Sequence, residues 1–315
     1  MVIIMNKIKS ILIMSILLAS IFALLSPVSA ATYHVYPGDD IEAIIEGATS
    51  GDTIYVHAGT HYPTRTITVS GHPSIIGDSP SNTIIDFNNI GGGIDASSQD
   101  GFTIKNITVK NSAGHGILVD DECLVENCIV YGCGGDGFRV DEESTLKNCL
   151  SYDNVDDGFN DEEGCTYINC TAANNGGSGF YSEDGEDTLV NCIAVGNKDD
   201  GFDIWNSDSE ILYSNAWGNS DVQYQGTSPG TGSISVDPFF MKGPLGDFYL
   251  FKSSPCVNKG SDSAINLGLS TGFTTNVKGA FDTGTVDMGY HYSSNGGSDS
   301  SLPIAKILEI IKSNQ

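Results

Sequence analysis

The stretch KNITVKNSAGHGILVDDECLVENCIVYGCGGDGFRVDEESTLKNC, from Lys105 to Cys149, decides the fold because it repeats one short unit. Each unit begins with an Asn followed by Ile or Cys, and ten residues later comes a Gly followed by Ile or Phe. Both pairs recur at spacings of 21, 21, 21 and 22 residues. The positions are Asn106, Asn127, Asn148, Asn169 and Asn191 for the first pair and Gly116, Gly137, Gly158, Gly179 and Gly201 for the second.

A unit of this length predicts one coil of a parallel β-solenoid. It is too short for two packed helices with their turns, and no ten-residue stretch in it has the helical spacing of apolar residues. It contains two or three short alternating runs separated by Gly, Asn and Asp, as solenoid coils do. The regular coils extend from about Phe102 to Asn219.

The two ends of the solenoid carry different patterns. Residues 31–59 predict an N-terminal cap, in which a short amphipathic helix at Asp40–Ala48 closes the open end of the core. From Gly232 onward, turns set by Pro and Gly predict a C-terminal cap at 232–292. The composition of residues 293–315 predicts a flexible linker followed by an apolar helical face at 304–311, which is either a tail helix or an attachment to a partner or the cell surface.

Residues 1–30 have the features of a secretory signal peptide. Lys7 and Lys9 precede an apolar stretch, and Val28-Ser29-Ala30 supplies a small-residue cleavage site. The apolar stretch is short and is followed by Pro27, so we expect no stable membrane span after cleavage. The sequence therefore predicts a secreted or cell-surface protein with one domain at 31–292, and we expect it to be a monomer.

The predicted mature chain is strongly acidic. Removing the signal peptide takes away two of the 14 basic residues and no acids, which leaves 40 acidic against 12 basic residues and a net charge of −28. Arg65 and Arg139 are the only arginines. Such a surface repels phosphate backbones, so no nucleic acid partner is expected. It would equally repel a polyuronate unless divalent cations bridged the two.

Eight cysteines in an exported protein would ordinarily suggest disulfides. Residues stacked on consecutive coils have parallel Cβ directions about 4.8 Å apart, which is too far for a relaxed disulfide. We therefore interpret the stacked cysteines as small core hydrophobes with free thiols. The Asn before each predicts a side-chain hydrogen-bond ladder at a bend. The four stacked positions are Cys128, Cys149, Cys170 and Cys192.

The coils and the segments at both ends resemble exported right-handed parallel β-helix proteins of bacteria and archaea over residues 31–292. The end segments that carry the resemblance include Asp237-Pro238-Phe239-Phe240 and Asp287-Met288-Gly289-Tyr290. The resemblance implies an all-β fold, a single-stranded right-handed parallel β-helix. This scaffold serves lyases, epimerases, adhesins and inert surface proteins, so it does not determine function.

Two segments, Asp156-Asp157-Gly158-Phe159-Asn160 and Asp199-Asp200-Gly201-Phe202-Asp203, resemble the calcium motif of family 9 polysaccharide lyases. In these calcium-dependent pectate lyases, an Asp before Gly on the preceding coil completes the site, and a Lys after Gly-Phe on the following coil is the base. Beside the first segment, Asp136 fills the preceding position and Tyr181 the base position. Beside the second, Ser178 precedes and no Gly-Phe-Lys follows. The resemblance implies calcium at Asp136, Asp156, Asp157 and Asn160, with Asp199, Asp200 and Asp203 as the weaker candidate.

Strand alternation predicts two columns of residues along one edge of the solenoid. The Phe after each Gly should point inward, so the residue after it should point outward. Adjacent carboxylates in such columns lie about 5 Å apart and repel by roughly 3 kcal/mol at an effective dielectric near 20. A bound cation, a raised pKa or separation by solvent would each relieve this repulsion, and calcium suits carboxylate and amide oxygens. The outward column is Leu118, Arg139, Asn160, Tyr181 and Asp203, and the turn column is His115, Asp136, Asp157, Ser178 and Asp200.

Two functions remain open from the sequence. The first is binding of an acidic polysaccharide or cell-surface glycan through calcium, with weak or lost β-elimination because neither segment has the Lys base. Tyr181 and Arg139 are the candidate catalytic and substrate-binding residues, with Tyr181 either a base or an aromatic platform for a sugar ring. The second is a non-catalytic surface or adhesion solenoid that uses calcium for stability only.

Overall fold

The structure is a computed structural model that describes residues 29–293. The predicted signal peptide up to residue 28, and the linker and tail helix at 294–315, lie outside the described residues. The chain divides into two compact units at residue 31, and the fold below is that of the second unit. Within residues 29–293, no helix is long and apolar enough to cross a membrane.

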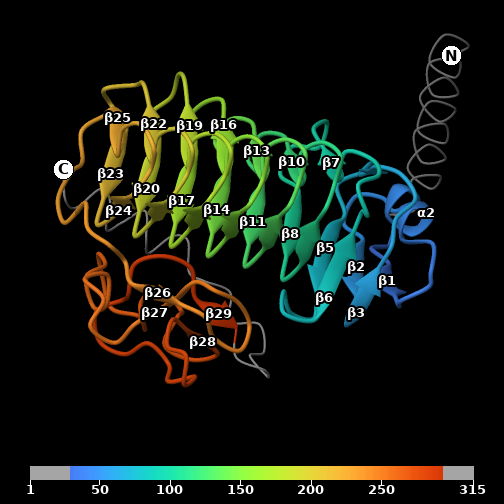
Figure 1. The fold of residues 1–315 in the computed structure, drawn as a ribbon. Coiled ribbons are helices and arrows are strands. Elements are labelled where there is room, and N and C mark those ends of the chain that lie inside the picture. The colour runs from blue at the N-terminus through green and yellow to red at the C-terminus, as the bar shows by residue number, and fades with distance from the viewer. Residues whose placement is uncertain (1–28, 294–315) are drawn as a thin grey trace, which may run out of the picture. The chain divides into compact units, whose positions relative to one another are not determined.

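The chain winds through three parallel sheets, and each regular coil adds one short strand to each sheet (Figure 1). Sheet A contains β1 (Thr32–Val35), β2 (Thr53–Val56), β5 (Ser74–Gly77), β8 (Thr103–Lys105), β11 (Leu124–Glu126), β14 (Thr145–Lys147), β17 (Thr166–Ile168), β20 (Thr188–Val190) and β23 (Glu210–Leu212). Sheet B contains β3 (Gly59–His61), β6 (Thr83–Asp86), β9 (Thr108–Lys110), β12 (Ile129–Tyr131), β15 (Leu150–Tyr152), β18 (Thr171–Ala173), β21 (Ile193–Val195) and β24 (Asn215–Trp217). Sheet C contains β4 (Ile67–Thr68), β7 (Ile94–Ala96), β10 (Ile117–Val119), β13 (Phe138–Val140), β16 (Phe159–Asp161), β19 (Phe180–Ser182), β22 (Phe202–Ile204) and β25 (Tyr224–Gly226). The parallel solenoid predicted from the repeat is confirmed.

The repeat keeps identical residues in register through the core. On sheet C, Phe138, Phe159 and Phe180 pair in sequence with ring centroids 4.9 and 4.7 Å apart, and all three rings are buried. The inward direction predicted for these side chains is confirmed. The four stacked cysteines are likewise fully buried with free thiols, as predicted. Stacking like on like gives the core both its apolar burial and favourable ring contacts.

The bend from sheet A to sheet B, here the A–B bend, is formed by the repeated Asn. All five Asn residues have φ between 48° and 60°, a left-handed conformation that Asn tolerates better than most residues. The Nδ2 of Asn127 donates to Oδ1 of Asn106 at 2.8 Å, and Asn148 donates to Asn127 at 3.1 Å. Further along, Asn191 donates to Asn169 at 3.3 Å. The predicted ladder is confirmed except at the step from Asn148 to Asn169, where the amides bond elsewhere.

The N-terminal end of the core is closed by α2 (Ile41–Glu46), within the range predicted for the capping helix. The Asp40 side chain caps the helix by accepting from the backbone N–H of Ala43 at 3.0 Å. Ile41 and Ile45 are buried against the first coils. At the other end, Ile234 bridges to Asn215 and extends the last coil.

Residues 237–293, here called the clasp, fall in the predicted C-terminal cap and pack against the outer faces of sheets A and B. They form two short antiparallel pairs, β26 (Phe240–Met241) with β27 (Tyr249–Leu250), and β28 (Phe273–Thr274) with β29 (Tyr292–Ser293). The clasp lies beside the coils and straddles the A–B bend (Figure 1). On the sheet A side, Ile168 and Val190 pack against Leu267 and Leu269. On the sheet B side, the buried cluster joins Ile129, Leu150 and Ala173 to Phe248, Tyr249, Tyr290 and Tyr292.

Candidate functional site

The outer face of sheet C is the side of the solenoid that carries the predicted site. The apolar contacts of the clasp fall on sheets A and B, so the outward column of sheet C faces away from it. A hollow of about 450 Å³ opens on this face. Arg139, Asn160 and Tyr181, which occupy three successive rungs, all line it. The remaining lining residues are acidic: Glu142, Asp161, Glu162, Glu163, Glu183 and Asp184.

The carboxylates of the turn column join one coil to the next. Oδ1 of Asp136 accepts from the backbone N–H of Asp157 at 3.0 Å. Oδ1 of Asp157 in turn accepts from the N–H of Ser178 at 2.6 Å. Oδ1 of Asp200 accepts from the N–H of Val222 at 2.7 Å. An Asp before Gly therefore has a structural role in this solenoid, because it satisfies a turn N–H of the following coil.

The first candidate calcium set has its oxygens largely engaged. Oδ2 of the buried Asp136 lies 3.2 Å from Nδ1 of His115 and 3.8 Å from Nη1 of Arg139. Oδ2 of Asp157 accepts from the side-chain amide of Asn160 at 3.1 Å. Burial, followed by the nearby charge of Asp136, raises the pKa of Asp157 to about 6, although the Ser178 N–H opposes the shift. Asp156 is exposed. These contacts engage the carboxylate oxygens of Asp136 and Asp157, and this set is not among the acidic trios of the described residues whose oxygens converge within 4.8 Å.

The second candidate set converges more closely and gains a member. Carboxylate oxygens of Asp199, Asp200 and Asp221 lie within 4.8 Å of one another. Oδ1 of Asp203 is buried without a hydrogen-bond partner. Burial, followed by the charge of Asp200, raises the pKa of Asp203 to about 6. In the described residues one other acidic trio converges in this way, formed by Asp100, Asp120 and Asp121.

The sequence reasoning did not include Asp221 in either candidate set. The coil that contains Asp221 lacks the Gly-Phe pair by which the repeat was recognised. The pairing of Phe202 with Tyr224 nevertheless places Asp221 one rung after Asp199. Counting back from an aromatic residue, rather than from Gly, would have found it.

Both candidate bases have partners that restrain them. The Tyr181 hydroxyl donates to Oε1 of Glu183 at 2.6 Å, and this bond, with smaller effects of burial and acidic charge, raises the pKa of Tyr181 to about 12. Nη2 of Arg139 lies 3.7 Å from Oε1 of Glu162. A guanidinium remains charged in proteins, so Arg139 can attract an anion but does not accept a proton. In the second set, the rung after Asp203 holds Gln225, whose amide is no base.

A second asparagine ladder, absent from the sequence reasoning, stiffens the bend from sheet B to sheet C. Asn154 donates to Asn175 at 3.0 Å, Asn175 to Asn197 at 3.1 Å, and Asn197 to Asn219 at 2.9 Å. All four side chains are buried. Their spacing of 21, 22 and 22 residues was a visible signal. Asn154, Asn175 and Asn197 each lie three residues before a member of the turn column, namely Asp157, Ser178 and Asp200.

The comparisons with known proteins agree with this architecture. The family described as "Pel9A-like, right handed beta helix region" matches residues 28–233. Among solved structures, the chain is similar to pectate lyase Pel9A at 15% identity, over 84% of this chain and 98% of that one, with a TM-score of 0.47. It is similar to the catalytic domain of a GH87 α-1,3-glucanase variant in complex with nigerose at 15% identity, over 70% of this chain and 49% of that one, with a TM-score of 0.47. The chain thus spans about half the length of the glucanase structure. No curated protein matches the sequence.

Proposed function

Because the chain belongs to the Pel9A-like right-handed β-helix family, we propose that it binds an acidic polysaccharide through calcium on the outer face of sheet C. We further propose that β-elimination is weak or absent. The predicted signal peptide supports a secreted or cell-surface location for this activity. The acidic polysaccharide that we propose is a polyuronate, the class to which the substrate of a pectate lyase such as the similar Pel9A belongs.

The observation that carries the proposal is the convergence of carboxylate oxygens of Asp199, Asp200 and Asp221 within 4.8 Å of one another. The carboxyl of Asp203, which has a buried oxygen without a hydrogen-bond partner, feels the charges of Asp200 and Asp199. Two unit charges about 5 Å apart repel by roughly 3 kcal/mol at an effective dielectric near 20, so this group needs neutralisation at neutral pH. Hard carboxylate oxygens are the ligands that calcium prefers. The proposed set is therefore Asp199, Asp200, Asp203 and Asp221, in preference to the set around Asp157.

A bound calcium ion would offset the charge repulsion between an acidic polymer and this acidic face. Asp199, Asp200, Asp203 and Asp221 would hold the calcium ion, which would attract a uronate carboxylate and make the proton on the adjacent sugar carbon more acidic. Arg139 supplies a positive charge in the hollow to position a second carboxylate. Tyr181 offers a ring on the same face, which suits contact with the apolar side of a sugar.

The weak step is proton abstraction. Tyr181 has a pKa of about 12 and is protonated at neutral pH, Arg139 stays charged, and Gln225 occupies the rung after Asp203. A missing general base typically lowers the rate by about 10²- to 10⁴-fold. Binding of polysaccharide does not depend on this step.

The alternative is a non-catalytic surface module in which calcium only stabilises the coils. The coil-to-coil hydrogen bonds of Asp136, Asp157 and Asp200 favour it, because they show turn carboxylates in structural roles. In that case calcium would raise the melting temperature by linkage without any glycan affinity.

Three measurements on the full chain test the proposal. Calorimetric titration should detect calcium in the wild type, and Asp203→Asn should weaken it at least about tenfold, the scale on which even outer-shell partners act. Asp157→Asn is the matched control and should retain affinity. Loss of affinity in Asp157→Asn alone would move the site to the first set.

Polygalacturonate then separates the two functions. Affinity electrophoresis should show calcium-dependent retardation that Arg139→Ala weakens, while a neutral glucan gives none. Absorbance of the unsaturated product should rise slowly or not at all. Calcium binding without retardation by any acidic polymer would favour the stabilising module.

A further inference from the structure

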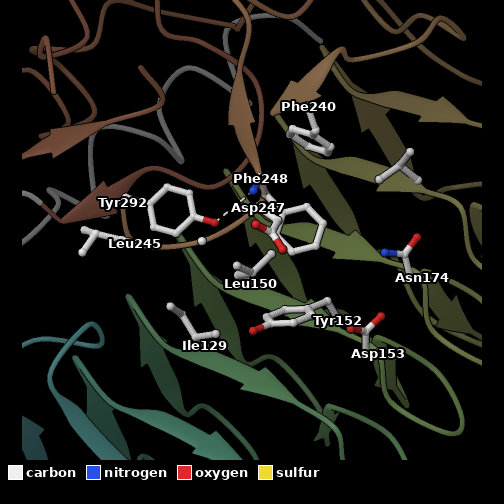
Figure 2. Close-up of a pocket in the computed structure, with 12 residues that line it drawn as sticks. Ile129, Leu150, Tyr152, Asp153, Asn174, Phe240, Leu245, Asp247, Phe248 and Tyr292 are labelled. Carbon is white, nitrogen blue, oxygen red and sulfur yellow. Dashed lines mark hydrogen bonds between the residues drawn. The ribbon is translucent and has the colours of Figure 1, made fainter. Parts of the chain in front are cut away.

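A second cavity lies on another side of the solenoid, between sheet B and the clasp (Figure 2). It has a volume of about 340 Å³, within the range of small-molecule sites. Its walls come from the outer face of sheet B, including Leu150 and Tyr152, and from clasp residues Phe240 and Phe248. The cavity shares no lining residue with the hollow on sheet C.

Aromatic rings held by one another form much of the wall. The Tyr152 ring stacks on Tyr131 with centroids 4.7 Å apart, and its other contact is Phe248 at 5.1 Å with a tilt of 56°. Phe248 in turn meets Phe240 edge-on at 5.4 Å. Neighbouring rings restrict the rotation of each, so the aromatic surface is in place before any ligand arrives.

Two carboxylates and an amide complete the cavity. Asp153 and Asn174 follow adjacent strands of sheet B and are exposed at the mouth, and Asp247 comes from the clasp (Figure 2). Burial raises the pKa of Asp153, the Asn174 hydrogen bond lowers it, and the charge of Asp247 raises it again, so the two carboxylates sense each other. Among the described residues, those that line the cavity include no Lys, Arg or His. Lys242 meets Asp247 outside the cavity, at 3.3 Å and largely exposed.

We propose that this cavity binds an organic ammonium ion. A cation against aromatic rings gains the attraction of their π faces, and the exposed carboxylates of Asp153 and Asp247 add charge attraction, part of which Lys242 offsets at Asp247. The net charge of −26 concentrates cations around the whole chain. The same carboxylates repel uronates, so this site and the sheet C face select opposite charges. The shared chemistry is an ammonium group, whose source is either a small free amine or an amino sugar.

The direct test is titration of the full chain with tetramethylammonium, followed by calorimetry or by NMR of the ligand. Saturable binding is expected, and tert-butanol, a neutral molecule of similar shape, should not bind. Tyr152→Leu should weaken tetramethylammonium by about threefold to thirtyfold, the range of a cation–π contact, while Tyr152→Phe keeps the ring and the affinity. Equal binding of tert-butanol, or no binding of tetramethylammonium, would overturn the proposal.

Two exposed substitutions keep the test valid if Tyr152→Leu does not fold. Asp153→Asn and Asp247→Asn should each weaken binding by about twofold to fivefold, as expected for exposed charge pairs. Asp208→Asn, an exposed acid at another bend, is the matched control and should change nothing. If neither cavity variant differs from this control, the assignment of the site is wrong.

Glucosamine and N-acetylglucosamine distinguish the source of the ammonium group. Both have the same ring, and only glucosamine carries a positive charge. Tighter binding of glucosamine than of tetramethylammonium supports the proposal and identifies the ligand as an amino sugar. Weaker binding of glucosamine also supports the proposal and identifies the ligand as a small free amine. Binding of N-acetylglucosamine as tight as that of glucosamine would contradict it and indicate a pocket for neutral sugars.

Discussion

His291 and Asn148, 143 residues apart, form a reciprocal pair of hydrogen bonds at the A–B bend. The His291 backbone N–H donates to Oδ1 of Asn148 at 2.7 Å, and Nδ2 of Asn148 donates to the His291 carbonyl at 2.9 Å. Asn169 donates to the carbonyls of Asp287 and Gly289 in the same manner. The interrupted step of the asparagine ladder is therefore where the clasp attaches.

Asn148→Gly should destabilise the fold by about 1–3 kcal/mol, because it removes both buried bonds to His291. Gly adopts φ of 48° without strain, so the substitution isolates the side chain. Asn106→Gly is the matched control, since Asn106 has φ of 60° and a ladder bond but no bond to the clasp. Denaturant unfolding of both variants checks the difference. Equal losses would mean that the clasp bonds contribute nothing beyond the ladder.

All eight cysteines should be unreactive in the native protein and reactive once it is unfolded without reductant. They are buried and free, and burial raises the pKa of thiols such as Cys128, to about 12, and Cys256, also to about 12. A thiol reagent that absorbs on reaction counts them in both states. Fewer than eight in denaturant would reveal disulfides, and fewer than four would overturn the stacked-thiol interpretation.

Tyr181→Phe should leave any elimination activity and polygalacturonate binding nearly unchanged. The hydroxyl is committed to Glu183 and its pKa is about 12, whereas the ring that would contact sugar is kept. Tyr181→Ala should weaken binding and serves as the comparison. A drop in rate of about 10²-fold or more in Tyr181→Phe, without a change in binding, would identify Tyr181 as the base after all.

Without calcium, stability should fall as pH rises from about 4 to above 6. Burial, and then the charge of Asp187, raises the pKa of Asp161 well above its usual value, and the pKa of Asp203 rises to about 6. A raised pKa means that the folded state holds protons that the unfolded state has lost, so the stabilisation is complete below the unfolded pKa of about 4 and is lost as pH passes the folded pKa.

Melting temperatures in chelator between pH 4 and 8 check this dependence. Asp161→Asn mimics the protonated form and should flatten the decline, while the exposed Asp184→Asn should not. Calcium should reduce the decline in the wild type but not in Asp203→Asn. If the melting temperature of Asp161→Asn falls with pH as steeply as that of the wild type, the cause is the general acidity of the chain and not the protonation of Asp161.

The fold was predictable because each coil repeats the same local constraints. An Asn in the left-handed conformation, a Gly at the next bend and an inward Phe recur at one spacing, so every coil predicts its neighbours. The capping helix was predictable for a similar reason, since Asp40 and the Ile41/Ile45 face are local signals. The clasp was not predictable, because its bonds to the A–B bend join residues 70 to 143 positions apart and no periodic pattern encodes them.

For the candidate site, the sequence predicted which residues form the outward column and the turn column, and nothing finer. The sequence placed Asp136, Asp157 and Asp200 at equivalent turns, but it could not show which carboxylates were already bonded to the next coil. Asp221 escaped because its coil replaces Gly-Phe with Gln-Tyr. Preference between the two calcium sets depends on hydrogen bonds and burial, which repeat spacing does not determine.

The clasp also restricts the number of coils that the solenoid can have beside it. Its bonds reach three consecutive rungs, at Asn148, Asn169 and Asn191, from fixed points on one short segment between Ser261 and His291. Inserting or deleting a coil among these rungs would displace the rungs beyond the change by about 4.8 Å relative to the others, too far for all of the bonds to form together. Duplication of coils before the clasp begins its contacts carries no such cost. Relatives of this chain that retain the clasp should therefore vary in length on the N-terminal side of Ile129.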